Sequence, residues 1–173
     1  MQTRTGVADA TGANRVLLNN GDPFPAISVQ LAGGERLVIP DDLAGSYAVV
    51  LLYRGSWCPY CNAQLAAFSR ARQKLDAIGV KVVALSVDDE PRTQALIDKH
   101  RLEFPVGFGA DVDEIAALTG AYTNADPKYF ESTDFVLSPD GRVVVAVYSS
   151  GAIGRIMPDD VAGFVSYVQS HAE

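Results

Sequence analysis

Two continuous apolar runs in the first half of the chain predict buried β-strands. Residues 47–53 read YAVVLLY and residues 80–87 read VKVVALSV, which is typical of strands buried on both faces. Between them, apolar residues recur at the three- and four-residue spacings of one helix face: Leu65, Phe68, Ala71, Leu75 and Ile78. Pro59 suits the first turn of this helix and Gly79 its end. The pattern predicts a βαβ unit with parallel strands.

The rest of the chain predicts two hairpins and three further helices. The hairpins pair residues 27–31 with 36–39 and residues 133–137 with 143–148, each across a glycine-containing turn. Helices are expected at 91–100, 112–119 and 159–171, and a short apolar segment at 104–108. No repeat or linker divides this order. We therefore expect an N-terminal arm over residues 1–20 and one domain over residues 21–173.

Composition and charge restrict the function. Of the 173 residues, 48% are hydrophobic and 20% charged, which indicates a folded globular chain. The formal net charge of −7 supplies no basic patch, so nucleic acid and anionic membranes are not expected partners. No apolar run is long enough to cross a bilayer, and the N-terminus lacks the pattern of a secretory signal. We expect a cytoplasmic protein.

The two cysteines of the chain, Cys58 and Cys61, are separated by only two residues. A disulfide between them would close a very short loop and would add little stability. In a reducing compartment this spacing favours catalysis or metal binding over a scaffolding role. The pair directly follows a predicted strand and begins a predicted helix, so it should lie at the carboxyl edge of the sheet.

This placement predicts different roles for the two thiols. Cys58 is at the helix N-terminus, where free N–H groups and the helix dipole favour a thiolate. We expect Cys58 to be the more acidic and more exposed thiol. Cys61, one turn into the helix, is expected to be buried and to attack a mixed disulfide or sulfenic acid formed on Cys58.

Supporting roles are assigned to neighbours of the pair. Trp57 is expected to shelter the Cys58 sulfur from bulk water, and Arg54 to supply positive charge. Pro59 is expected to stiffen the ring that a disulfide between Cys58 and Cys61 would close. Ser56 is either a turn residue, which is the simpler interpretation, or a hydrogen-bond donor to a peroxide.

Other interpretations of the pair and of nearby polar residues stay open. A zinc site would need His100 and His171, which lack zinc-type spacing, and are expected on helix surfaces. Asn62 excludes a covalent haem motif, and no cofactor is expected. Two ordinary core cysteines are the plainest alternative. Asp88 and Asp89 are expected to solvate a turn and cap the next helix.

Residues 53–61, YRGSWCPYC, resemble the active-site segment of the peroxiredoxin-like branch of the AhpC/TSA (alkyl hydroperoxide reductase and thiol-specific antioxidant) family. Residues 21–25 and 133–137 resemble its lead-in and its late hairpin. The resemblance implies an α/β, thioredoxin-like three-layer fold: a central mixed sheet flanked by helices, with an N-terminal β-hairpin extension. It also implies thiol-based reduction of peroxides or disulfides.

The sequence departs from the family pattern at three places. A peroxiredoxin carries proline and threonine or serine seven and three residues before the attacking cysteine, where this chain has Leu51 and Gly55. We therefore expect a slower peroxide reaction, and expect Gly55→Thr to restore it if the loop accepts the side chain. Ser132 or Thr133 occupies the place of the fold's cis-proline. The family's arginine near this strand is missing, and Arg155 is the candidate substitute.

The leading hypothesis is an antioxidant enzyme in which Cys58 reduces a peroxide and Cys61 resolves the product to an intramolecular disulfide. The alternatives are a thiol–disulfide oxidoreductase that needs no peroxide, and a non-catalytic redox sensor. A thioredoxin- or glutathione-type electron donor and a homodimer are further expectations.

Overall fold

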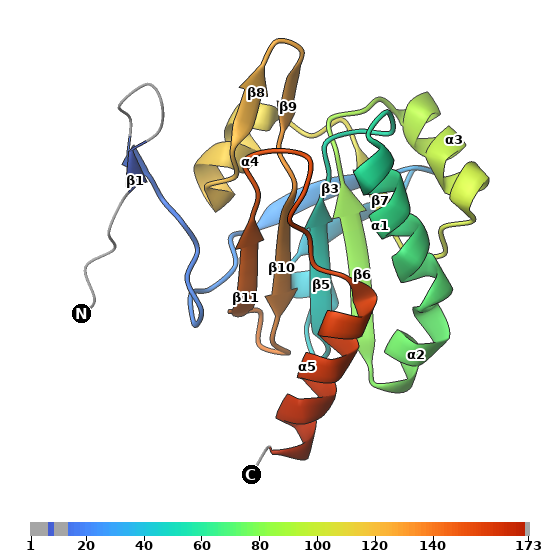
Figure 1. Ribbon diagram of the computed structural model, residues 1–173, viewed down its shortest axis with the longest axis vertical. Coiled ribbons are helices and arrows are strands. Elements are labelled where there is room, and N and C mark those ends of the chain that lie inside the picture. The colour runs from blue at the N-terminus through green and yellow to red at the C-terminus, as the bar shows by residue number, and fades with distance from the viewer. Residues whose placement is uncertain (1–6, 9–13, 172–173) are drawn as a thin grey trace.

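A seven-stranded mixed sheet forms the centre of the molecule (Figure 1). The computed structural model describes residues 7–8 and 14–171. The strands of the sheet are β3 (Ile27–Leu31), β4 (Arg36–Ile39), β5 (Tyr47–Leu52), β6 (Val80–Leu85), β7 (Val106–Phe108), β10 (Thr133–Leu137) and β11 (Val143–Tyr148). Their order is β11-β10-β5-β6-β7-β3-β4. β5, β6 and β7 run parallel and the other pairings are antiparallel, which confirms the predicted mixed sheet.

Helices cover both faces of this sheet. One hydrophobic core joins it to α1 (Pro59–Arg70), α2 (Arg72–Ala77), α3 (Glu90–His100) and α5 (Pro158–Ser170). A second core, on the other face, includes residues of α4 (Val112–Thr119). Figure 1 shows α1, α2 and α5 in front of the strands. The layers are those of the predicted thioredoxin-like fold.

The two apolar runs form the adjacent parallel strands β5 and β6, in register from Tyr47 with Val80 to Leu52 with Leu85. Every residue of β5 after Tyr47 is buried, as expected for a central strand. The connection between them differs from prediction in one respect. The expected single helix is divided at Ala71, where ψ is 4° rather than about −42°.

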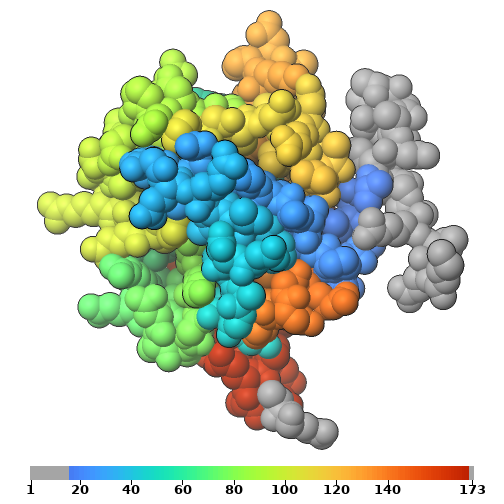
Figure 2. Space-filling view, turned by 180° about the vertical axis from the view of Figure 1, so that it is seen from behind, coloured from blue at the N-terminus to red at the C-terminus, as the bar shows by residue number. Residues whose placement is uncertain are grey.

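Both predicted hairpins are present, as β3–β4 and β10–β11. The β3–β4 hairpin forms one edge of the sheet, and Figure 2 shows its blue residues lying across the rear face of the molecule. The expected helices at 91–100, 112–119 and 159–171 correspond to α3, α4 and α5.

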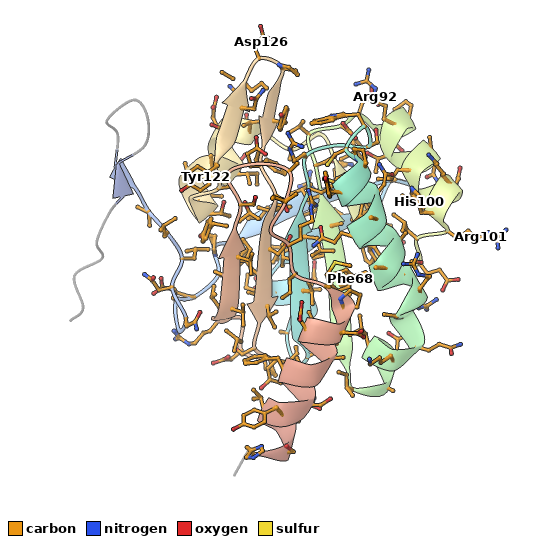
Figure 3. All side chains as sticks on the ribbon, in the orientation of Figure 1. Phe68, Arg92, His100, Arg101, Tyr122 and Asp126 are labelled. Carbon is orange, nitrogen blue, oxygen red and sulfur yellow. The ribbon has the colours of Figure 1, made fainter. Side chains whose placement is uncertain are left out.

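β1 (Val7–Ala8) and β2 (Asn14–Arg15) pair antiparallel, which agrees with the expected N-terminal hairpin extension. Three short elements were not predicted because each has too few residues to show a hydrophobic period. They are the 3₁₀ helix η1 (Asp41–Leu43), β8 (Thr123–Ala125) and β9 (Lys128–Phe130). β8 and β9 form a separate hairpin, with Asp126 at its tip (Figure 3). This hairpin matters for the site because β9 carries Tyr129.

Residues 1–6 and 9–13 of the expected N-terminal arm lie outside the described residues. The end of the arm contacts the domain: Leu18 is buried, and its N–H donates to the Tyr148 hydroxyl at 3.0 Å. The division of the chain at residue 20 stays a prediction. Within the described part of the chain, no helix has the length and apolar character needed to span a membrane.

Candidate active site

Cys58 is held at the point where β5 passes into α1, as the sequence predicted. It is the N-cap residue of α1, and its sulfur accepts the N–H of Cys61 at 3.3 Å. Pro59 follows in the first turn, where a missing N–H breaks no helical hydrogen bond. The helix N-terminus therefore places its free donors and its positive dipole end on the Cys58 sulfur.

Both cysteines are buried, with 0% of either residue exposed. The expectation that Cys58 would be the more exposed thiol is therefore wrong. Both are free thiols that belong to the core shared by α1 and the sheet. Any difference in their reactivity has to come from their electrostatic surroundings rather than from solvent access.

Two arginines from distant parts of the chain converge on the sulfurs. Nη1 of Arg54 and Nη2 of Arg155 each lie 3.7 Å from the sulfur of Cys58. Nη2 of Arg155 also lies 3.1 Å from the sulfur of Cys61, and the backbone N–H of Arg54 lies 3.4 Å from it. The structure thus brings together the two arginines that the sequence singled out.

These contacts separate the pKa values of the two thiols. Burial acts to raise the pKa of Cys58, but hydrogen bonds from Cys61 and Arg54 and the charge of Arg155 outweigh it, and the pKa is lowered. For Cys61, burial and its hydrogen bond to Cys58 raise the pKa to about 11, despite the charge of Arg155. Cys58 is therefore the thiol that ionises first, as predicted.

The Arg54 guanidinium is enclosed by two aromatic rings and a carboxylate. Its Cζ lies 4.9 Å from the ring centre of Trp57 and 5.2 Å from that of Tyr129. The Tyr129 hydroxyl accepts from Nη2 at 3.0 Å, and Glu131 pairs with Nε at 2.8 Å. The two rings meet edge to face, 5.0 Å between centres. Trp57 itself is 53% exposed, so it forms the outer wall of this cluster.

Ser56 and Thr133 have structural contacts. The Ser56 N–H donates to Oδ2 of Asp88 at 2.7 Å, which agrees with a turn residue. Asp88 is buried, so the expectation that it solvates the turn is wrong; Asp89 caps α3 as predicted. The Thr133 hydroxyl donates to the Glu131 carbonyl at 3.1 Å, and no hydrogen bond joins it to either sulfur among the residues described.

Asn62 and His100 brace the loop that carries Cys58. The Asn62 amide donates to the carbonyls of Ser56 and Cys58, both at 2.8 Å, and its Oδ1 lies 2.7 Å from Nε2 of His100. His100 is half-buried between α3 and α1 rather than a free surface residue, and burial lowers its pKa. His171 is exposed and stacks on Tyr167, as expected of a surface residue.

A buried polar chain leads from the sheet to Arg155. Oδ2 of Asp134, in β10, accepts from Nε2 of Gln64 at 2.9 Å, and Oε1 of Gln64 accepts from Nη1 of Arg155 at 3.0 Å. Asp134 is buried, which raises the pKa of its carboxyl to about 7 in spite of its hydrogen bonds from Ile156 and Gln64. The sequence analysis did not predict this series of buried hydrogen bonds. The signal was present, because Asp134 is a charged residue directly before the apolar run of residues 135–137.

Comparison with known proteins gives the chain its family. Residues 20–146 match the AhpC/TSA family. A Treponema denticola protein described as a peroxiredoxin is 28% identical over 145 residues, which cover 82% of this chain and 69% of that protein. A Chlorobaculum tepidum peroxiredoxin is 29% identical over 153 residues, which cover 86% of this chain and 72% of that protein.

Solved structures agree on the fold. Mycobacterium tuberculosis AhpC superposes with a TM-score of 0.74 at 22% identity, covering 90% of this chain and 96% of that one. A cysteine-to-serine mutant of peroxiredoxin 6 from Arenicola marina gives 0.76 at 18% identity, covering 90% and 76%. The chain therefore belongs to the AhpC/TSA family, as a thioredoxin-like, thiol-dependent enzyme homologous to the peroxiredoxins.

Proposed function

We propose that this protein reduces a peroxide with the Cys58 thiolate and that Cys61 resolves the product as an intramolecular disulfide. The observation that carries the proposal is the convergence of Arg54, Arg155 and the α1 N-terminus on the sulfur of Cys58. A thiolate is stabilised there, and the same donors can bind the oxygens of a peroxide.

The first step breaks the O–O bond. The Cys58 thiolate attacks one peroxide oxygen and forms an S–O bond, and the second oxygen leaves with the O–O electron pair. Protonation of the leaving oxygen gives an alcohol or water, and Cys58 becomes a sulfenic acid. The positive charge of the two arginines favours this step because negative charge moves from sulfur to oxygen in the transition state.

The second step makes the disulfide. The Cys61 sulfur attacks the sulfur of the Cys58 sulfenic acid, the S–O bond breaks, and the oxygen leaves as water with the proton of Cys61. A pKa of about 11 keeps Cys61 protonated at neutral pH, so the thiol must lose its proton as it attacks. Nη2 of Arg155, 3.1 Å from this sulfur, supports that loss.

Turnover then needs two electrons from outside the site. A thioredoxin- or glutathione-type thiol would reduce the disulfide by exchange and restore both thiols. A reducing compartment such as the cytoplasm supplies such donors. We also propose a homodimer, which the resemblance to the family suggests.

A thiol–disulfide oxidoreductase is the second candidate, since the complete CxxC sequence is sufficient for exchange with other disulfides. A redox sensor would use the same disulfide without turnover. The convergence of Arg54 and Arg155 on the Cys58 sulfur favours a peroxide, because their N–H groups can donate to the peroxide oxygens.

Rapid mixing of the reduced protein with three oxidants separates these candidates. We expect hydrogen peroxide and an organic hydroperoxide to oxidise Cys58 much faster than they oxidise a free thiol, and a mixed-disulfide substrate to react more slowly. Oxidation by both peroxides at the rate of a free thiol, with rapid reaction of the disulfide, would establish the oxidoreductase instead. Disulfide formation without turnover in the presence of a dithiol donor would indicate the sensor.

A further inference from the structure

Arg155 reaches the sulfurs from a loop, so its position depends on what holds its guanidinium. Nε and Nη2 donate to the carbonyl of Ala152 at 3.0 and 2.9 Å, within the same loop. Nη1 donates to Oε1 of Gln64, a side chain of α1, at 3.0 Å. Apart from its contacts with the two sulfurs themselves, the bond to Gln64 is the described hydrogen bond that joins Arg155 to the helix that carries Cys58 and Cys61.

The orientation of the Gln64 amide decides whether this contact exists. Its Nε2 donates to Oδ2 of Asp134 at 2.9 Å and to the carbonyl of Ile156 at 2.8 Å. The flipped amide would set its oxygen against these two acceptors and its NH₂ group against the guanidinium of Arg155. Asp134 and Ile156 thus turn the Gln64 oxygen toward the arginine.

Asp134 also fixes the backbone beside Arg155. The same oxygen, Oδ2, accepts the N–H of Ile156 at 3.0 Å. A single carboxylate oxygen on β10 therefore holds the residue after Arg155 and the side chain that binds Arg155. Asp134 pairs with Leu51 of β5, so this carboxylate is held at the centre of the sheet.

We propose that Asp134 is a positioning residue which, through Gln64 and Ile156, aims Arg155 at the sulfurs of Cys58 and Cys61. The inference rests on the proposed role of Cys58 as the reactive thiol. Asp134 touches neither sulfur in any described hydrogen bond, so it acts on them through the arginine.

A purely structural role explains the carboxyl poorly. Asp134 is 1% exposed, in a strand whose other residues are all buried, and its Oδ1 has no hydrogen-bond partner among the residues that the structure describes. An apolar residue would fill this position at a lower desolvation cost. The presence of a carboxyl group here is explained by its Oδ2, which orients Gln64 and Ile156.

The test is the pKa of Cys58, taken from the pH dependence of its alkylation by iodoacetamide in the fully reduced protein. Arg155→Met, Asp134→Leu and Gln64→Met should each raise that pKa by roughly one unit, because each removes the arginine from the sulfur or releases it. Asp134→Asn should keep the wild-type pKa of Cys58, since an amide oxygen can accept the same two hydrogen bonds from Gln64 and Ile156. Asp98→Leu is the matched control: Asp98 accepts from Gln94 at 2.9 Å on an exposed helix face, and its loss should change nothing.

The sign of the change separates positioning from simple charge. Removing a negative charge near a thiol favours the thiolate, so a direct electrostatic role of Asp134 predicts a lower Cys58 pKa in Asp134→Leu. Positioning predicts a higher one, and predicts no further rise when Asp134→Leu or Gln64→Met is added to Arg155→Met.

A Cys58 pKa that stays constant or falls in Asp134→Leu and Gln64→Met would overturn the proposal. So would an equal rise in the Arg155→Met background, or no effect of Arg155→Met itself. If Asp134→Leu does not fold, Gln64→Met alone and combined with Arg155→Met tests the link through Gln64, and Asp134→Asn tests the carboxyl group: positioning predicts the wild-type Cys58 pKa in this variant, and a lower pKa would overturn the proposal. The readout does not use peroxide, so slow peroxide oxidation would contradict the proposed function without touching this inference.

Discussion

Gly55 lies directly against the indole ring of Trp57: a Cβ on Gly55 would stand 2.3 Å from Nε1 and 2.8 Å from Cδ1 of that ring. This position is the one at which the family pattern has a hydroxyl-bearing residue. A side chain at this position therefore does not fit unless Trp57 moves, so the condition on which Gly55→Thr was expected to restore peroxide reactivity is not met. The glycine makes room for Trp57, which packs against Tyr129 and Arg54 and cannot move without disturbing them.

We predict that Gly55→Ala displaces Trp57 and lowers the rate at which peroxide oxidises Cys58. Trp57 is the one tryptophan of the chain, so the change in its position is measurable by intrinsic fluorescence. Loss of the ring from beside Arg54 should also loosen the guanidinium from the sulfur, and a misplacement of about 1 Å can cost roughly a hundredfold in rate.

The matched control is Gly163→Ala in α5, where an added Cβ meets no atom within 4 Å. It should leave both fluorescence and rate unchanged, and should stabilise the helix by about 0.5–1 kcal/mol. Wild-type fluorescence and wild-type rate in Gly55→Ala would show that Trp57 has no part in shaping the site.

Alkylation of the reduced protein should select Cys58 at neutral pH. Its pKa is lowered by hydrogen bonds and charge, whereas the pKa of Cys61 is raised to about 11. Because the thiolate is the reactive form, the rate at Cys58 should rise with pH and level off before Cys61 begins to react. Mass spectrometry of iodoacetamide-treated protein measures the extent of alkylation at each of the two cysteines. Modification of Cys61 ahead of Cys58 would reverse the assigned roles.

Arg54→Met should raise the pKa of Cys58 by roughly one unit, since a hydrogen bond to the sulfur is lost. The same change leaves the buried carboxylate of Glu131 without its cationic partner, which acts in the same direction. The pH dependence of alkylation gives the pKa. Arg92→Met, at an exposed arginine of α3 (Figure 3), is the control and should have no effect. An unchanged Cys58 pKa in Arg54→Met would exclude Arg54 from the stabilisation of the thiolate.

Asp134 should make the protein less stable as the pH rises toward neutrality. Its pKa is about 7 in the folded protein, against an ordinary value of 3.8. Between these values the folded state binds more protons than the unfolded chain, so the free energy of unfolding falls with increasing pH, by at most about 1.4 kcal/mol per unit for this group.

Asp134→Asn removes this contribution. In denaturant unfolding, the free energy of unfolding of the variant minus that of the wild type should increase by more than about 1 kcal/mol between roughly pH 5 and pH 7. A difference in unfolding free energy that stays constant over this range would mean that Asp134 does not titrate there.

The fold and the reactive pair were largely predictable from the sequence, and the surroundings of the pair were not. Continuous apolar runs predict the strands β5 and β6, and apolar residues at helical spacing predict the helix that follows Cys58, because burial dictates which of these positions are apolar. The site also depends on contacts between distant segments, such as Arg54 with Tyr129, which are 75 residues apart. No local period encodes them. The exposure of Cys58 was mispredicted for the same reason.

The most direct test of the central claim is the mass spectrum of Cys61→Ser protein after one equivalent of hydrogen peroxide. Without the resolving thiol, the product of peroxide attack should accumulate on Cys58 as a sulfenic acid, detected as one added oxygen or as its dimedone adduct. Cys58→Ser is the control and should take up no oxygen. A Cys58 that remains unmodified in Cys61→Ser, while peroxide is present, would contradict the account.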